Sequence, residues 1–196
     1  APFSSFLTPE WAISKLGSAG QAPLYSDTRI VDNDNCPLPA GERGEICLRG
    51  PNIMKGYWNR PEATAEAIDG EGWFHSGDIG YLDEDGFLFI CDRLKDMVIS
   101  GGENVYPAEV EGALYRHEAI AEVAVIGMPD EKWGEAVTAV VALHPGQELT
   151  LEELREFAEP LLARYKLPLR LHIVDALPRN PAGKVLKFVL KEQLVD

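Results

Sequence analysis

The chain has 196 residues, of which 45% are hydrophobic and 26% are charged, a composition typical of a folded globular protein. Its formal net charge of −14 argues against a nucleic-acid partner, because binding to a phosphate backbone needs a surplus of Lys and Arg. No apolar run is long enough to predict a transmembrane helix, and the first residues do not have the basic and apolar regions of a signal peptide.

The first part of the chain predicts a small β-rich subdomain. The first 27 residues contain Pro, Gly and Ser without periodicity, which predicts mostly loop. Short runs typical of strands follow at 28–32, 45–49 and 87–91. A helix is expected at 61–68, where Pro61 suits the first helical position. The sequence Asp-Glu-Asp-Gly at 83–86 predicts a hairpin turn.

After Asp92 the pattern changes to alternating helices and strands. Helices are expected at 107–116, 150–164 and 184–193, and strands at 123–126, 136–143 and 171–174. Thr150 and Glu153 have the spacing of a capping box. The change of pattern predicts a domain boundary, with one domain at 1–94 and another at 95–196. The fold class expected is α/β (α+β), a β-rich subdomain followed by an α/β lobe.

Three cysteines, Cys36, Cys47 and Cys91, are widely spaced along the chain. Their spacing does not match a metal site, so no metal ligands are expected. We interpret them as small buried hydrophobic residues. Free thiols in this number are consistent with a reducing, cytoplasmic location.

Polar segments that contain glycine interrupt the predicted elements at three places. The first segment, 73–78, has an aromatic pair followed by a tight glycine turn that presents Asp78. A carboxylate there could accept both hydrogen bonds of a vicinal diol such as ribose. Taken alone, an Asp after a Gly is more often an ordinary turn residue.

The second segment, 92–107, joins the two predicted domains. Its four charged residues at 92–96 are, taken alone, typical of a solvated linker. The pair Gly101-Gly102, however, allows a ligand to approach the backbone closely.

The third segment, 178–184, is a loop of Pro and Gly that presents Lys184. It is not a P-loop, because Pro178 and Val185 stand where that motif needs Gly and Ser or Thr.

In this order and spacing, the three segments resemble those of the adenylate-forming superfamily. Its members include acyl-CoA synthetases, firefly luciferase and nonribosomal-peptide adenylation domains. The resemblance extends from about Gly20 to Gln193, and also includes the stretches 41–50, 56–58 and 61–64. The segment 100–109 looks like that of bacterial fatty-acyl-CoA ligases and related enzymes. The family's phosphate loop and acyl pocket lie upstream of the matched part, so we expect a C-terminal fragment that forms no adenylate by itself.

The resemblance implies roles for individual residues in the adenylation step. Asp78 matches the aspartate that binds the ribose hydroxyls of the adenylate, and Arg93 matches the arginine that reaches the ribose or phosphate. Lys184 matches the lysine of the adenylation half-reaction. Such an ammonium would offset the repulsion between the substrate carboxylate and the α-phosphate of ATP. Lys95 matches the hinge about which a mobile C-terminal domain turns.

The resemblance also implies a role for the glycine pair in the second half-reaction, in which a thiol attacks the acyl-adenylate. Gly102 matches the glycine beside the channel for the pantetheine arm of coenzyme A, and Gly101 adjoins it. The implied function is that of an ATP-dependent acyl-CoA ligase acting on a carboxylic acid, with a fatty acid as the expected class. Its substrates would be ATP, the acid and coenzyme A, with Mg²⁺ accompanying ATP, and its partner would be the missing N-terminal domain.

Two other functions remain open from the sequence. One is a noncatalytic interaction module on the same scaffold. The other is an adenylation-domain fragment that loads a carrier protein.

Overall fold

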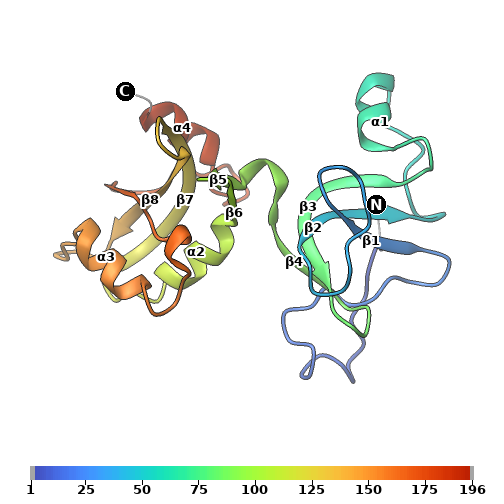
Figure 1. Ribbon diagram of the computed structural model, residues 1–196, viewed down its shortest axis with the longest axis horizontal. Coiled ribbons are helices and arrows are strands. Elements are labelled where there is room, and N and C mark those ends of the chain that lie inside the picture. The colour runs from blue at the N-terminus through green and yellow to red at the C-terminus, as the bar shows by residue number, and fades with distance from the viewer. Residues whose placement is uncertain (1–2, 195–196) are drawn as a thin grey trace. The chain divides into compact units, whose positions relative to one another are not determined.

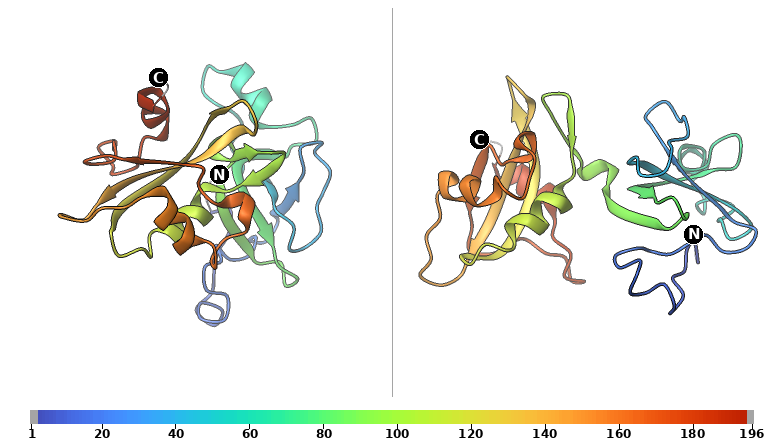
Figure 2. Two further views of the ribbon diagram at one scale, coloured as in Figure 1. Left: turned by 60° about the vertical axis from the view of Figure 1, so that its left-hand side comes forward. Right: turned by 60° about the horizontal axis from the view of Figure 1, so that its bottom comes forward.

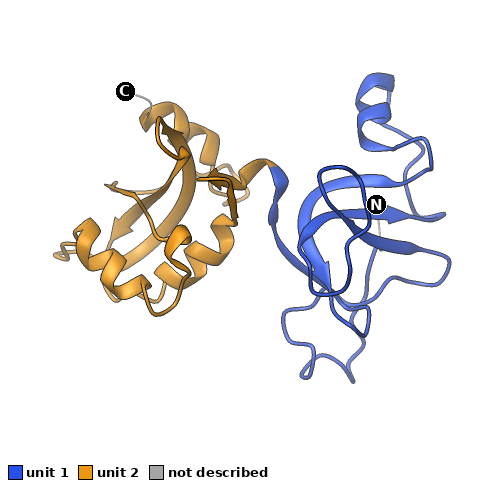
Figure 3. Cartoon of the chain, viewed as in Figure 1, with its two compact units in different colours: residues 1–94 blue, residues 95–196 orange. Residues whose placement is uncertain are grey.

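A computed structural model describes residues 3–194 of the chain (Figure 1). The chain divides into two compact units, residues 1–94 and 95–196 (Figure 3). Each unit has its own sheet and its own hydrophobic core. Among the described residues, no helix combines the length and the apolar character needed to cross a membrane.

The first unit is built on a four-stranded antiparallel sheet. Its elements are β1 (Asp27–Val31), β2 (Gly44–Arg49), α1 (Pro61–Ala67), β3 (Phe74–Leu82) and β4 (Leu88–Arg93). The strands lie in the order β1-β2-β3-β4, each antiparallel to its neighbour. One face of the sheet packs on a cluster that includes Ile30, Ile46 and Leu88.

Most predictions for the first unit are confirmed. The three predicted strands and the helix beginning at Pro61 are present, and residues 3–26 form loops. In the predicted hairpin turn, the Asp83 carboxylate accepts the Phe87 amide at 2.8 Å, and Gly86 has φ +78°. The prediction of a tight turn at 73–78 is wrong, because β3 continues through this segment from Phe74 to Leu82.

In its described part, 95–194, the second unit contains a five-stranded sheet and three helices. Its strands are β5 (Val98–Ser100), β6 (Glu103–Val105), β7 (Ile120–Asp130), β8 (Gly134–Leu143) and β9 (Arg170–Ile173). Its helices are α2 (Pro107–Leu114), α3 (Leu151–Ala158) and α4 (Lys187–Leu194), with a short 3₁₀ turn at η2 (Arg164–Lys166). A further 3₁₀ turn, η1 (Leu94–Asp96), spans the boundary between the units. The order is β6-β5-β8-β7, and β9 runs parallel to β8.

The long strand β8 lies between two hydrophobic clusters. Val137 and Val141 belong to a cluster with residues of α2 and α3, whereas Val140 belongs to a second cluster with Leu190 of α4. Because successive side chains of a strand point to opposite faces, helices cover both sides of the sheet (Figure 2). The predicted mixed α and β fold class is confirmed.

Two predicted helices of the second unit have the wrong bounds. The predicted capping box is present, with Thr150 and Glu153 bonded reciprocally, but the helix ends at Ala158 and not at 164. Pro160 cannot donate the amide hydrogen bond that a longer helix would need. The final helix begins at Lys187, because residues 178–186 form a loop closed by a bridge between Arg179 and Val185.

Candidate functional site

The segment that presents Asp78 is a bulge within β3. Glu45 of β2 pairs with Ile79, and Cys47 pairs with His75, so residues 76–78 of β3 lie opposite Ile46 alone. Gly77 has φ +69°, a conformation that glycine adopts without strain. Bulges change the direction of side chains next to ligand sites, and this one includes the three residues that follow His75, the last of which is Asp78.

The bulge brings Asp78 together with Arg93. The two residues are direct partners across β3 and β4, and Arg93 Nε lies 2.7 Å from Asp78 Oδ1. The side chains retain exposures of 30% for Asp78 and 51% for Arg93, so both can still reach a ligand from solvent. Two of the predicted nucleotide-binding residues therefore form one charged pair at the edge of the first unit.

Lys95 lies two residues beyond this pair, in the 3₁₀ turn η1. The turn has no buried residue, and the Lys95 side chain is exposed. A change of backbone angles here would therefore disturb little packing within either unit.

The glycine pair forms the two-residue turn between β5 and β6. Ser100 pairs with Glu103, and Gly101 and Gly102 have φ of +62° and +85°. Positive φ at both central positions is the type I′ geometry, for which two glycines are well suited.

The two glycines differ in what surrounds them. A β-carbon on Gly101 would lie 2.9 Å from Trp133 Cε3, and the Gly101 amide donates to the Trp133 carbonyl at 2.8 Å. A β-carbon on Gly102 would meet no described atom within 4 Å. Gly101 thus lets the turn pack against Trp133, whereas Gly102 faces open space.

Beside this turn lies a hollow of about 560 Å³ that the sequence did not predict. Its lining combines aromatic rings, cations and apolar groups: Ser100, Lys132, Trp133, Arg155, Arg164, Tyr165, Leu167 and Leu169. The Lys132 ammonium lies 4.7 Å from the centre of the Trp133 ring. The lining residues come from distant parts of the sequence, so no local spacing could have indicated them.

Hydrogen bonds fix the backbone of the loop that presents Lys184. The Asn180 Oδ1 accepts the amides of Ala182 at 3.0 Å and Lys184 at 2.9 Å. Arg179 Nη1 donates to the Gly183 carbonyl at 2.7 Å, and its Nη2 donates to Glu122 Oε1 at 2.6 Å. Within the described part of the chain, the exposed Lys184 ammonium has no ion pair. The loop is therefore held while its terminal cation is free.

Glu122 connects this loop to β7. Its second oxygen accepts the Leu177 amide at 3.1 Å. The hydrogen bond from the Leu177 amide, together with the one from Arg179, lowers the pKa of Glu122 below the usual value of 4.5. Glu122 was not singled out from the sequence, since its two partners lie more than 50 positions further along the chain.

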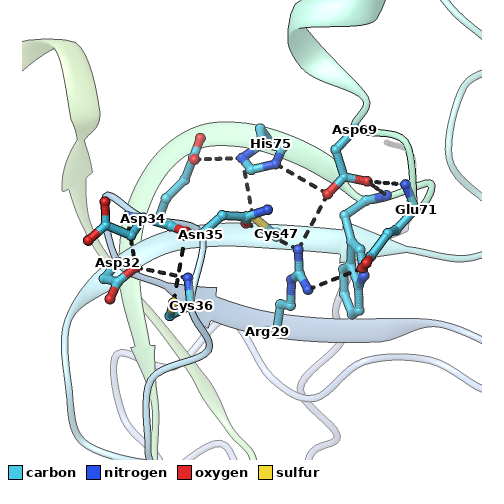
Figure 4. A network of polar contacts seen from close by, with 11 residues as sticks. Arg29, Asp32, Asp34, Asn35, Cys36, Cys47, Asp69, Glu71 and His75 are labelled. Atoms are coloured by element: carbon cyan, nitrogen blue, oxygen red, sulfur yellow. Dashed lines mark hydrogen bonds and ion pairs between the residues drawn. The ribbon is translucent and has the colours of Figure 1, made fainter.

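A partly buried polar network lies behind the Asp78 bulge (Figure 4). His75 Nδ1 lies 2.8 Å from Glu45 Oε2 and 3.5 Å from Cys47 Sγ, and its Nε2 lies 3.7 Å from Asp69 Oδ2. Burial, reinforced by the Glu45 carboxylate, raises the pKa of Cys47 to about 11. The Cys47 thiol is therefore neutral near pH 7.

Glu45, Cys47 and His75 are also residue types that bind zinc, and their donor atoms lie within 4.8 Å of one another. Two ligands at about 2.0–2.1 Å from a tetrahedral zinc would stand roughly 3.3 Å apart. The 2.8 Å between His75 and Glu45 is instead a hydrogen-bond distance. We interpret the group as a hydrogen-bonded network.

The cysteines divide into three environments. Cys47 is buried, as expected, and Cys91 is partly buried. Cys36 is exposed, so its interpretation as a buried hydrophobic residue is wrong. It lies in the turn after β1, where the Asp32 carboxylate accepts its amide at 2.8 Å.

The predicted site residues thus fall into three places. Asp78 and Arg93 form one pair, with Lys95 shortly after them in the chain. Gly101 and Gly102 occupy the β5–β6 turn. Lys184 occupies a different loop of the second unit, before α4.

Two family models and several known proteins match this chain. Residues 109–184 match the family model of the AMP-binding enzyme C-terminal domain, and residues 1–58 match the AMP-binding enzyme model. A 2-succinylbenzoate–CoA ligase of a Geobacillus species is 50% identical over 95% of this chain and 37% of its own length. A long-chain-fatty-acid–CoA ligase of Mycobacterium tuberculosis is 49% identical over 96% of this chain and 37% of its own length.

A solved structure shows the same fold. The o-succinylbenzoate CoA synthetase of Bacillus subtilis, in complex with its acyl-adenylate intermediate, matches with a TM-score of 0.85 and 42% identity over 98% of this chain and 38% of that one. The chain spans 37% of the length of the curated relatives named above. It belongs to the adenylate-forming superfamily and corresponds to the C-terminal portion of its acyl-CoA ligases.

Proposed function

We propose that the whole protein is an AMP-forming acyl-CoA ligase, which joins a carboxylic acid to coenzyme A at the expense of ATP. In this proposal residues 1–94 are the end of a large N-terminal domain, and residues 95–196 are the mobile C-terminal domain of the protein. The main supporting observation is the Lys184 loop, whose backbone is fixed by Asn180 and Arg179 while its ammonium remains free. This is the arrangement that the adenylation step requires.

In the first step, Lys184 would stabilise the attack of the substrate carboxylate on the α-phosphate. Both groups are anionic, so their approach is opposed by charge repulsion. A compact ammonium on a long stem can lie between them and stabilise the charge that develops at phosphorus. The products of this step are the acyl-adenylate and pyrophosphate.

Asp78 and Arg93 would hold the nucleotide during this step. Asp78 Oδ1 lies against Arg93, and Oδ2 would serve as the acceptor for the ribose diol. The remaining guanidinium donors of Arg93 suit a ribose or phosphate oxygen. Because the pair is half-exposed, it can exchange water for these ligand groups.

In the second step, the thiol of coenzyme A would attack the acyl-adenylate past Gly102. The absence of a side chain at Gly102 leaves that side of the turn open. The adjoining hollow offers Trp133 and Tyr165 as surfaces for a base, and Lys132 and Arg164 as cations for phosphates. Coenzyme A carries a nucleotide at the end of its pantetheine arm, whereas a carrier protein presents the arm without one. A hollow that suits a base and phosphates therefore favours coenzyme A over a carrier protein.

The two steps need different groups at one carbonyl carbon. Lys184 must leave before the thiol arrives, and Lys95 is the proposed hinge for this exchange. Its turn η1 contains no buried residue, which supports the proposal, because rotation there would cost little packing energy.

The acid remains assigned only as a carboxylic acid. The relatives named above are ligases of 2-succinylbenzoate and of long-chain fatty acids, and a further relative is a feruloyl-CoA synthase of an Amycolatopsis species. Fatty acids therefore stand beside aromatic acids as candidates. Among the described residues none of the three cysteines forms a disulfide, which is consistent with a reducing, cytoplasmic location.

Mg²⁺ would accompany ATP, and one solved relative contains ATP and a magnesium ion. Among the described residues, the side chains that could together bind a metal ion are those of Glu45, Cys47 and His75. A thiol is a poor ligand for Mg²⁺, which prefers oxygen. These residues do not fit the ion, and we assign them no part in its binding.

The test is made on the full-length protein. A ligase should show ATP–pyrophosphate exchange with at least one acid from a panel of fatty and aromatic acids, and should form a thioester when coenzyme A is added. A noncatalytic module would show neither reaction. Thioester formation on a carrier protein, but not on coenzyme A, would support the adenylation-domain alternative.

A further inference from the structure

We propose that Glu45 is a positioning residue for the nucleotide, because its carboxylate holds the β3 bulge in the conformation that presents Asp78. The inference rests on the proposed function, since it requires Asp78 to bind the ribose. It adds a residue of β2 that does not itself touch the ligand.

The first support is the contact between Glu45 and the bulge. Residues 76–78 have no partner on β2, so their amides need other acceptors. Glu45 Oε1 accepts the Gly77 amide at 3.0 Å, and the Ser76 hydroxyl accepts the Asp78 amide at 3.1 Å. Two side chains thus replace the missing ladder bonds immediately before and at Asp78.

The second support is the anchoring of Glu45 on its other side. Its Oε2 lies 2.8 Å from His75 Nδ1, and His75 Nε2 faces Asp69 at 3.7 Å. Asp69 is itself held, since its Oδ1 accepts the amides of Glu71 and Trp73, each at 2.9 Å. Figure 4 shows the contacts of the His75 ring with Cys47 and with Asp69. The Glu45 side chain is only 18% exposed, so it is a fixed acceptor.

The chemistry explains why an ionised carboxylate suits this position. Both of its oxygens accept hydrogen bonds, and both neighbours, the Gly77 amide and the His75 ring, can donate. Hydrogen bonds to a charged acceptor are stronger than those between neutral groups. Gly77 could otherwise adopt many backbone conformations, because glycine is the least restricted residue. Removing Glu45 should therefore loosen Gly77 and, with it, the direction of Asp78.

The experiment measures ribose discrimination in the full-length enzyme. The quantity is the ratio of kcat/KM for ATP to kcat/KM for 2′-deoxy-ATP, and the same ratio for 3′-deoxy-ATP. Asp78→Ala should lower at least one of these ratios by about 10-fold or more, because a hydrogen bond to a charged group is lost. Glu45→Ala should lower the same ratio towards the Asp78→Ala value.

Conservative variants and a control separate positioning from general damage. Glu45→Gln keeps an oxygen for the Gly77 amide, so its ratio should stay within about 3-fold of the wild type. Glu42→Gln, at an exposed position before β2, should leave the ratio unchanged. A purely structural defect would lower kcat/KM for ATP and its deoxy analogues equally, and would not change the ratio. If Glu45→Ala does not fold, Glu45→Asp gives the same readout with a carboxylate too short to reach Gly77.

The outcomes distinguish the two proposals. A lowered ratio in Asp78→Ala with an unchanged ratio in Glu45→Ala, or in Glu45→Asp if that variant is used, overturns the role of Glu45 alone. Unchanged ratios in Asp78→Ala overturn the assignment of Asp78 to the ribose, and with it the basis of the inference.

Discussion

The bulge that presents Asp78 and the loop that presents Lys184 each hold a charged side chain in place, but they differ in whether that charge has a partner. Both backbones are fixed by carboxylates from a neighbouring strand, Glu45 for the bulge and Glu122 for the loop. At the bulge, however, the functional charge is already paired, since Asp78 lies 2.7 Å from Arg93. At the loop the functional ammonium has no ion pair in the described part of the chain.

This difference corresponds to the proposed roles. A group that only binds the nucleotide can keep a permanent partner, which holds it in one direction. A group that must approach the reacting atoms and then leave them would be hindered by an ion-pair partner on its own unit. The backbone of the Lys184 loop is therefore held firmly while the side chain is left free.

The largest expected effect is that of Lys184→Ala in the full-length enzyme. Loss of a charge that stabilises the transition state should slow adenylate formation by about 10²–10³-fold. Transfer from added acyl-adenylate to coenzyme A should remain near the wild-type rate, because Lys184 takes no part in it. Pyrophosphate exchange and single-turnover thioester formation measure the two steps. Equal losses in both would show that Lys184 is not confined to the first step.

Gly102→Leu should have the reverse effect. The side chain would enter open space beside the turn and obstruct the thiol, slowing thioester formation by about 10²-fold, while pyrophosphate exchange stays nearly intact. Gly102→Asn is the control for backbone strain, since Asn tolerates positive φ better than Leu. If both variants slow both steps to the same extent, the turn is needed for folding and not for access.

Glu122→Gln tests whether the loop needs its anchor. Weakening the bond to Arg179 should slow adenylate formation by roughly 10-fold and lower the free energy of unfolding by about 1 kcal/mol, because the pair is partly exposed. Lys191→Gln, on the neighbouring helix α4, is the matched control. Normal exchange activity in Glu122→Gln would mean that the bonds of Asn180 and the Arg179–Gly183 bond suffice to hold the loop.

The lowered pKa of Glu122 predicts how the stability of the same variant depends on pH. Because the folded-state pKa is below the usual 4.5, the ionised carboxylate stabilises the fold fully above that value. This contribution is lost as the pH falls through the folded-state pKa. Urea unfolding at several pH values should therefore show a stability difference between wild type and Glu122→Gln that shrinks in acid. A difference that grows in acid would contradict the lowered pKa.

The smallest effect is expected for the thiols near the bulge. Cys36 is exposed and should react first with iodoacetamide, whereas Cys47 is buried, with a pKa raised to about 11, and should react only on unfolding. Cys36→Ser should change the free energy of unfolding by less than about 0.5 kcal/mol. Peptide mapping by mass spectrometry identifies the labelled residue. Rapid labelling of Cys47 would show that the network behind the bulge opens readily.

Local features of the sequence predicted local structure well. The capping box of Thr150 and Glu153 and the turn after Asp83 depend on residues three or four positions apart, and both are present. The predicted helix 150–164 was too long because Leu161 and Leu162 continue its apolar pattern past Pro160. Tertiary packing uses Leu162 in the core without a helix there.

The supports of the candidate site could not be predicted in this way. Glu45 and Gly77 are 32 positions apart, and Glu122 and Arg179 are 57 apart. Each contact depends on how strands or loops meet in space, and a register change of one residue would remove it. The candidate ligand-binding residues were predicted from their resemblance to a family, whereas the residues that hold them could be identified only from the structure.

The central strand β8 has a consequence for slow motions of the second unit. Every residue from 136 to 142 is buried, and the strand contributes side chains to both hydrophobic clusters. Its amides should be among the slowest in the unit to exchange with deuterium, because exposing them requires both clusters to open. A substitution within β8, such as Val140→Ala, changes no residue of the Gly101–Gly102 turn or of the Lys184 loop. It would nevertheless lower the free energy of unfolding of the unit that carries both loops. Any activity that depends on either loop would therefore also depend on the packing of β8.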